Sequence, residues 1–194
     1  AERNKADMIV MGRRGRTGLK RLMMGSETAR TIGYAPCNVL VVPRAAKLEF
    51  KNILIATDGS KHSDAAVMEA AGIAKRCSSN LFVVAVVPSE SVSPLDIVNL
   101  EMQKGLISEE ELRTAEGNIK KAKDIALNEG VTVKGLILAG KPYEAITHAA
   151  KEKNADLIVV GSHGRTGLKR LLMGSVTERV IGTAECAVLV VKAK

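Results

Sequence analysis

Residues 156–191 have the sequence DLIVVGSHGRTGLKRLLMGSVTERVIGTAECAVLVV, in which two short apolar runs enclose a segment containing glycines. Residues 7–42 repeat this sequence at a constant offset of 149 positions, with 25 of 36 aligned positions identical. A long match at a fixed spacing indicates that a structural unit has been duplicated. The chain therefore contains one copy of this unit and a fraction of another.

Both copies contain the same glycine pattern, GxxG followed by nine residues and then GS. Its members are Gly12, Gly15, Gly25 and Ser26 in the first copy, and Gly161, Gly164, Gly174 and Ser175 in the second. In the second copy the pattern follows an apolar run typical of a buried strand, and its end opens a predicted helix. Glycine lets the backbone approach an anion closely, and the N–H groups of a helix start donate to its oxygens. We therefore predict a phosphate site.

Side chains near these glycines support the same prediction. Ser175 is expected to add a hydroxyl group while capping the helix, and Arg165, Lys169 and Arg170 raise the local positive potential. Any one of the glycines could instead only permit a tight turn, and Ser175 could be only a cap. The pattern is neither GxxxxGK[ST] nor GxGxxG, so it implies neither a P-loop NTPase nor a dinucleotide enzyme.

Apolar runs alternate with helical patterns along the rest of the chain. Strands are predicted at 51–57, 81–87, 131–138, 156–160 and 187–191, and helices at 65–74, 108–128, 142–152 and 175–182, with residues 89–105 forming a loop and a short helix. Such alternation predicts an α/β fold, a parallel sheet with helices on both faces, whose ligands bind beyond the carboxyl ends of the strands.

The repeat divides the chain into three parts. Residues 1–46 contain only the last strand, loop, helix and strand of the unit, residues 47–50 are a linker, and residues 51–194 are a complete unit. If a whole first unit existed, its first strand would lie near position −98, so we expect about a hundred further residues upstream.

Composition narrows the class of protein. The chain has 194 residues, 46% of them hydrophobic, with two Phe, two Tyr and no Trp, which indicates an aliphatic core. No apolar run approaches the roughly 18 residues that a membrane span needs, so we expect a soluble cytoplasmic protein. Its three cysteines, in no metal-binding spacing, are predicted to be reduced and buried.

The net charge of +8 lies mostly at the start of the chain. Residues 1–50 contain ten basic and four acidic side chains, a surplus of six, and the remainder has a surplus of two. Such a patch could attract nucleic acid, but a solvated surface is favoured, because the chain has almost no aromatic residues for stacking on bases.

Three segments resemble the universal stress protein family: GSHGRTGLKRLLMGSVTERVI, ILIATDGS and the closing AVLVV. The resemblance covers residues 51–194, and residues 1–46 resemble the last third of a second family domain. It implies an open five-stranded sheet of the adenine nucleotide alpha hydrolase type with strand order 3-2-1-4-5. It also implies dimerisation through the last strand and, with this glycine pattern, binding of ATP, with or without Mg²⁺.

The resemblance assigns binding roles to individual positions. Ala56, Thr57 and Asp58 would contact the adenosine part of the ligand, and Val86 the adenine through its backbone. The ribose and phosphates would be bordered by Val160, Gly161, His163, Gly164 and Arg165, and the phosphate chain held by Gly174, Ser175 and Val176. Relatives often have Pro at position 56 and an acid at position 88, where this chain has Ala and Pro. No catalytic residue and no metal ligand is assigned.

Several of these positions have a second interpretation. Asp58 could be an ordinary turn residue, with Ser60 as the actual helix cap. His163 could be a base, although a lone histidine in a loop is more often a donor or a bystander. In the first copy Glu27 replaces Val176 and would oppose phosphate, and no strand equivalent to 51–57 exists, so a vestigial half-site is expected there.

Three functions follow in order of support. The first is an ATP-binding regulatory protein of the stress response with slow or partner-dependent hydrolysis. The second is an ATPase or nucleotidyl-transfer enzyme of the same α/β class. The third is a nucleic-acid binder that uses residues 12–21.

The partial copy also predicts an assembly. Residues 39–42 should pair with residues 188–191, in the same chain or in a homodimer with exchanged segments, which would leave the strand at 8–11 as an open edge.

Overall fold

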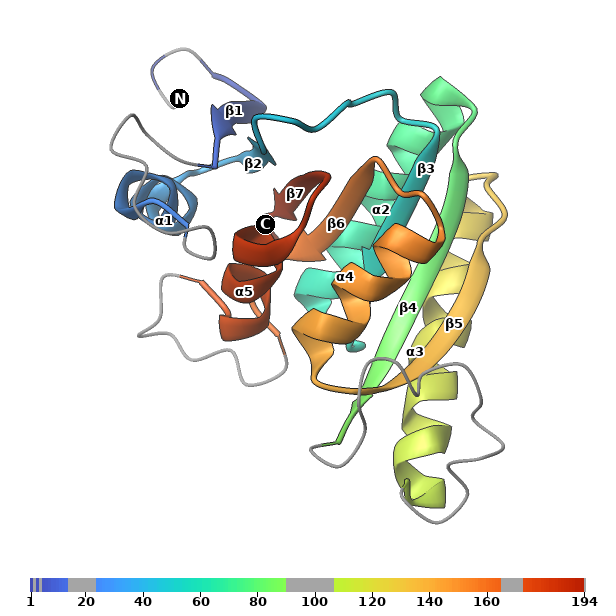
Figure 1. Ribbon diagram of the computed structural model, residues 1–194. Helices are drawn as coiled ribbons and strands as arrows, with labels where there is room; N and C mark the ends of the chain where they lie inside the picture. Colours follow the sequence, from blue (N-terminus) through green and yellow to red (C-terminus); the bar gives the residue numbers. More distant parts are fainter. Residues whose placement is uncertain (2, 4, 14–23, 90–106, 165–172, 194) are drawn as a thin grey trace.

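The computed structural model describes residues 1, 3, 5–13, 24–89, 107–164 and 173–193, and shows one seven-stranded sheet with the order β1-β2-β7-β6-β3-β4-β5 (Figure 1). The strands are β1 (Met8–Gly12), β2 (Asn38–Val42), β3 (Asn52–Ala56), β4 (Asn80–Pro88), β5 (Lys134–Gly140), β6 (Leu157–Gly161) and β7 (Ala187–Val191). Every neighbouring pair is parallel except β2 and β7, which are antiparallel. The sheet is therefore mainly parallel, as the alternation of strands and helices predicts.

Helices cover both faces of this sheet. They are α1 (Ser26–Tyr34), α2 (Lys61–Cys77), α3 (Glu109–Asn128), α4 (Pro142–Glu152) and α5 (Ser175–Thr183). One apolar cluster joins α2 and α3 to one face through Ile53 and Ile55, and a second joins α1, α4 and α5 to the other through Leu54. Because successive side chains of a strand point to opposite faces, two covered faces require an unbroken apolar run. The predicted α/β class is confirmed.

Capping residues fix where the helices begin. Ser60 caps α2 by accepting a hydrogen bond from the backbone N–H of Ser63 at 3.3 Å, and Ser108 and Glu111 form a capping box at the start of α3. The prediction that Ser175 caps α5 is wrong. Gly174 occupies the cap position in extended conformation, without a side-chain cap, and Ser175 is the first helical residue.

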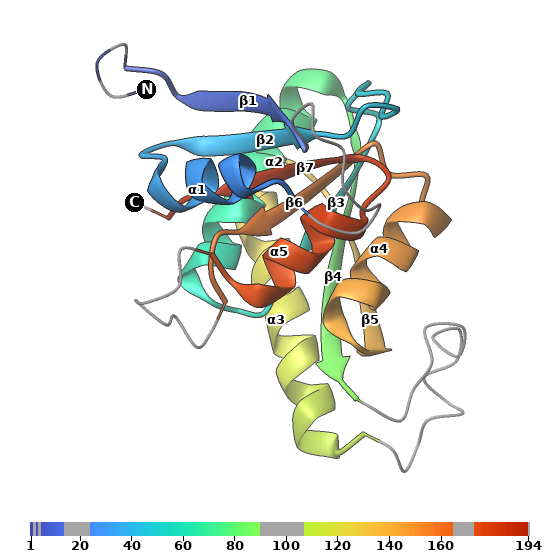
Figure 2. The ribbon, with the colours of Figure 1, turned by 60° about the vertical axis from the view of Figure 1, so that its left-hand side comes forward.

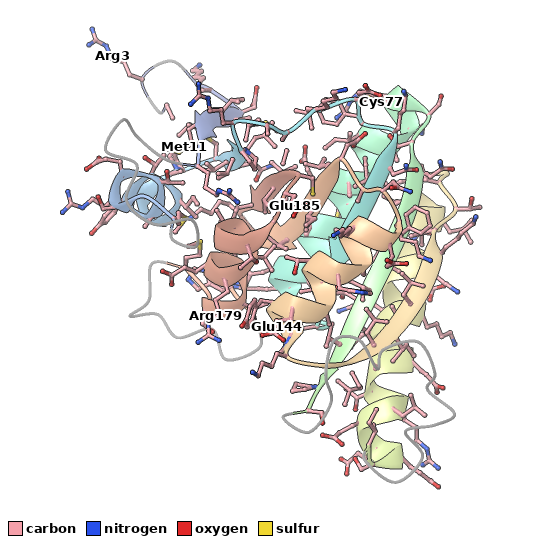
Figure 3. The ribbon with its side chains drawn as sticks, in the orientation of Figure 1. Arg3, Met11, Cys77, Glu144, Arg179 and Glu185 are labelled. Carbon is pink, nitrogen blue, oxygen red and sulfur yellow. The ribbon has the colours of Figure 1, made fainter. Side chains whose placement is uncertain are left out.

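Two further predictions need correction. The third strand of the complete unit begins at Lys134 rather than residue 131, because its register is set by pairing from Phe82↔Lys134 to Pro88↔Gly140. Cys77 is exposed in the last turn of α2 instead of buried (Figure 3). All three thiols are free, and burial raises the pKa of Cys186 to about 11. Residues 90–106, which include most of the predicted loop and short helix, lie outside the described residues.

The partial repeat, residues 1–46, folds like the end of the complete repeat, residues 51–194. After β1 the N–H of Arg13 donates to the carbonyl of Val42, as the N–H of Ser162 donates to that of Val191. In the partial repeat the hydroxyl of Thr28 bonds the carbonyl of Gly12, and in the complete repeat that of Thr177 bonds the carbonyl of Gly161. The same backbone geometry therefore recurs at both ends of the chain.

An approximate two-fold axis relates the two repeats. In the β2–β7 pair Leu40 lies opposite Leu189, its own equivalent at the offset of 149, and Val39 lies opposite Val190. Of the two pairings predicted for these strands, the structure has the one within a single chain. Figure 2 shows β1 outside β2 at the end of the sheet, where Val10 is 64% exposed. Among the described residues, β1 has no strand on its other side.

Contacts at the ends of α1 and α5 hold the repeats together. The guanidinium of Arg13 donates to the carbonyl oxygens of Ala184 at 2.6 Å and Ile181 at 3.3 Å, which belong to the last turn and cap of α5. On the other side of the axis the ammonium of Lys192 donates to the carbonyl of Gly33 in α1 at 3.4 Å. A cation at the carboxyl end of a helix interacts favourably with its last carbonyl groups.

Candidate functional site

A cavity of about 630 Å³ lies at the carboxyl ends of β3, β4 and β6. The first residues of α5 and α4 and one side of α3 complete its wall. Within the five strands of the complete repeat, β3 is the central strand, with β4 on one side and β6 on the other. The strand order reverses at β3, and open α/β sheets bind ligands in the crevice at such a position. The cavity is within the usual size range of small-molecule sites.

The connection from β6 to α5, here called the glycine loop, is fixed at both of its described ends. The N–H of Ser162 donates to the carbonyl of Val191 at 3.0 Å, and the N–H of Gly174 donates to the carbonyl of Ser162 at 2.9 Å. The first intrahelical bond of α5 runs from Glu178 to the carbonyl of Gly174. The N–H groups of residues 175–177 precede it and have no acceptor within the helix. The loop therefore presents a helix start to the cavity.

Other groups lie very close to two glycines of this loop. A Cβ atom on Gly161 would lie 2.7 Å from the carbonyl carbon of His62, in the first turn of α2. A Cβ atom on Gly164 would lie 2.7 Å from the Oδ2 atom of Asp58. The carboxylate of Asp58 therefore faces the glycine loop beyond the carboxyl ends of the paired strands β3 and β6.

The end of β3 is held in place by its own hydrogen bonds. The N–H of Thr57 donates to the carbonyl of Val84 at 2.9 Å, and the hydroxyl of Thr57 bonds that of Ser63 at 3.2 Å. The Oδ1 atom of Asp58 accepts from the N–H of Ser60 at 3.1 Å, so Asp58 forms the turn while Ser60 is the cap. Gly59 between them has a φ of +79°, a conformation that glycine adopts readily.

Eleven of the twelve residues to which the resemblance assigns binding roles lie in the wall of this one cavity. They are Ala56, Thr57, Asp58, Val86, Val160, Gly161, His163, Gly164, Gly174, Ser175 and Val176. The twelfth, Arg165, lies outside the described residues, as do Lys169 and Arg170. The geometry thus brings the end of β3 and the glycine loop together, although they are about a hundred residues apart in the chain.

Sequence reasoning missed the part of the wall that comes from α3. Glu110, Glu111, Thr114 and Asn118 line the cavity, together with Pro142 and Ile146 of α4. Asn118 lies so close to Gly59 that a Cβ atom there would be 2.2 Å from its Oδ1 atom. The capping sequence at Ser108 locates the start of α3, but no local pattern indicates which other loop this helix faces.

Sequence reasoning also missed a histidine pair beside the glycine loop. The hydroxyl of Ser162 lies 3.2 Å from the Nδ1 atom of His163 and 3.5 Å from the Nδ1 atom of His62. The two ring centroids are 5.3 Å apart. Burial lowers the pKa of His62, and His163, Lys61 and Lys192 lower it further, while Asp58 raises it. His62 and Ser162 support the wall without lining the cavity.

No group of three or more His, Cys, Asp or Glu side chains within the described residues is arranged to hold a metal ion. None of the described helices is long and apolar enough to cross a membrane.

Comparisons with known proteins agree with this geometry. The family model described as the universal stress protein family matches residues 1–43 and 49–192. A universal stress protein of Methanocaldococcus jannaschii is 43% identical over 143 residues, which are 74% of this chain and 82% of that protein. The solved structure of the hypothetical protein MJ0577 is 30% identical with a TM-score of 0.63, and the match covers 76% of this chain and 99% of that one.

A third relative was solved with a ligand. It is a universal stress protein in complex with cAMP, 25% identical with a TM-score of 0.60 over 75% of this chain and 99% of that chain. The family model spans both repeats, and the match to the Methanocaldococcus jannaschii protein is long and close. The chain belongs to the universal stress protein family.

Proposed function

We propose that this protein binds ATP in the cavity of the complete repeat and acts as a nucleotide-dependent regulatory protein of the stress response. One observation supports the proposal most: Asp58 and the glycine loop face each other across a single cavity that a helix start enters. The cAMP complex of a relative supports an adenine nucleotide as the class of ligand.

Each part of the wall suits one part of ATP. The end of β3, at Ala56 and Thr57, and the backbone of Val86 would contact the adenine. The carboxylate of Asp58 would accept hydrogen bonds from ribose hydroxyls, as carboxylates do in other nucleotide sites. The N–H groups at the start of α5, with the backbone of Gly161, Gly164 and Gly174, would bind the phosphates. Ser175 would add a hydroxyl donor, and His163 a ring N–H.

Slow or partner-dependent hydrolysis fits this wall better than rapid turnover. His163 and Asp58 are in the cavity and favour the second candidate, an ATPase or nucleotidyl-transfer enzyme. However, Asp58 already accepts from Ser60, and His163 bonds Ser162. Steady-state measurement of ADP release by the purified full chain, with and without Mg²⁺, separates the two. Several turnovers per minute would favour the enzyme.

Direct calorimetry with ATP tests the binding proposal, and the repeat supplies a matched control. Gly174 has a φ of −68°, and a Cβ atom there would come no closer than 3.5 Å to the non-adjacent residues that the structure describes, so Gly174→Ala should fold normally. The added methyl group would stand where phosphate approaches the backbone. We expect a loss of affinity of about tenfold or more, the worth of one hydrogen bond to a charged group.

The control is Gly25→Ala, the same change at the equivalent position of the partial repeat, where Gly25 has a φ of −65°. It should leave ATP affinity unchanged, with one nucleotide bound per chain. Two nucleotides per chain, or equal losses in the two variants, would contradict the assignment of the site to the complete repeat. Mass spectrometry of small molecules released from the purified protein identifies the nucleotide independently.

A further inference from the structure

The hydroxyl of Ser162 stands between two imidazole rings. Its oxygen lies 3.2 Å from the Nδ1 atom of His163 and 3.5 Å from the Nδ1 atom of His62. Ser162 is 1% exposed, so water does not readily replace either ring as its partner. His163 lines the cavity, whereas His62 lies behind it in the first turn of α2. The three side chains thus form a short chain of hydrogen bonds from α2 to the cavity wall.

The single proton of the serine hydroxyl couples the two rings. A hydroxyl donates one hydrogen bond, and a neutral imidazole has one N–H group. If Ser162 donates to His62, the Nδ1 atom of His163 must be the donor, and its Nε2 atom is then an acceptor. If Ser162 donates to His163 instead, the N–H of His163 is at Nε2, and His62 donates to Ser162. Phosphate therefore finds an N–H donor at the Nε2 atom of His163 only in the second arrangement, or when the two rings together carry one additional proton.

We propose that His62 and Ser162 are positioning residues that keep His163 a hydrogen-bond donor toward the phosphate chain, with one proton shared by the two rings when a polyphosphate is bound. This inference rests on the proposed ATP site and adds to it two residues that do not line the cavity. It also predicts that ATP binding takes up a proton, because the negative phosphates favour the protonated form of the pair.

The surroundings of His62 disfavour its protonated form. Burial lowers the pKa of His62, and Lys61 on its own helix and Lys192 after β7 act in the same direction, while Asp58 at the end of β3 opposes them. The rings disfavour a second proton in each other, because like charges 5.3 Å apart repel. Phosphate binding raises the proton affinity of the pair, so ATP affinity should increase as pH falls through the histidine range.

Proton uptake can be counted directly. Calorimetry of ATP binding in two buffers of different ionisation enthalpy gives the number of protons taken up, which we expect to be up to about one per ATP at neutral pH. Adenosine, which has no phosphate, should bind without uptake. Ser162→Ala keeps both rings but breaks the link between them, and His62→Gln removes one titrating ring. Both should reduce the uptake and weaken ATP binding at pH 6 about tenfold, with adenosine affinity unchanged, because His163 then titrates without its coupled partner.

His148→Gln is the matched control, because His148 lies on α4 outside the three-residue cluster. It should leave uptake unchanged. The inference is overturned if Ser162→Ala and His62→Gln bind ATP with the pH profile of the unmodified protein. If the unmodified protein binds neither ATP nor adenosine, the proposed function fails. The coupling of His62 and His163 is then tested by NMR titration of the imidazole nitrogens in the unliganded protein. An unchanged titration of His163 in His62→Gln overturns the coupling, and an altered titration supports it.

Discussion

At the scale of single residues, Gly161 lies directly against the backbone of another element. It ends β6, and the space that a side chain would need is filled by the backbone of His62 at 2.7 Å. Backbone atoms cannot rotate away as the end of a flexible side chain can. The packing of α2 against β6 therefore depends on the absence of a Cβ atom at this position.

Gly161→Ala should reduce the free energy of unfolding by about 1–3 kcal/mol, the usual cost of overpacking a filled site. Urea denaturation of the full chain, followed by circular dichroism, measures the change. Gly117→Ala is the comparison, because none of the described residues beyond its own helix backbone lies within 4 Å of a Cβ atom at Gly117 in α3. It should stabilise the protein by about 0.5–1 kcal/mol, the helix preference of Ala over Gly. Equal effects of the two changes would show that the contact with His62 is unimportant.

Residues of the site can be predicted from the sequence where a recognisable motif directly follows a predicted strand. The glycines and Asp58 follow strands directly, so the fold class alone predicts that they gather at one edge of the sheet. Asn118 and His62 occupy ordinary helix positions, and only the packing of α3 beside Gly59 and of α2 beside Gly161 brings them to the site. Such partners are long-range properties that no short pattern contains.

At the scale of elements, the apolar runs of the chain locate the strands well because both faces of the sheet are covered. The start of β5 is the exception. Val131 and Val133 are apolar and pack against the core, but they precede the residues that pair with β4. The apolar run therefore begins before the residues that pair with β4, and the pairing with β4 sets the start of β5.

The end of α5 offers the clearest test of how the partial repeat is held. Arg13 donates to two carbonyl groups there, at 2.6 and 3.3 Å. Arg13→Ala should leave them without this donor and loosen the partial repeat by about 1–3 kcal/mol. Hydrogen exchange of the β2 amides, compared with those of β4, measures local opening. Arg30→Ala is the control, since the side chain of Arg30 is 71% exposed. Unchanged exchange of β2 in Arg13→Ala would rule out this role.

At the scale of the whole molecule, β2 occupies the edge of β7 that would otherwise be available to a second chain. We propose that a homodimer through the last strands, Val39–Val42 against Val188–Val191, requires the partial repeats to exchange between chains. Such exchange keeps every strand pair of the monomer, so the two forms differ mainly in the path of the linker.

A chain of residues 47–194 should dimerise, because β7 loses its neighbour. A solved structure supports its independent folding, since the match to MJ0577 covers 99% of that chain but only 76% of this one. Sedimentation equilibrium should show a dimer for this chain and a concentration-dependent mixture, or a monomer, for residues 1–194. A monomeric 47–194 chain with native circular dichroism would contradict the role of β2 as a substitute partner.

The pairing of Leu40 with Leu189 has a consequence for how this protein can change over time. In a dimer of identical chains, one codon supplies both sides of the symmetry axis, so every substitution acts twice. Here the two sides are encoded separately, and they already differ: Arg13 contacts the end of α5, while Lys192 contacts α1. A mutation can therefore adapt the glycine loop of the complete repeat to a ligand, or the equivalent segment of the partial repeat to contact between the repeats, without changing both.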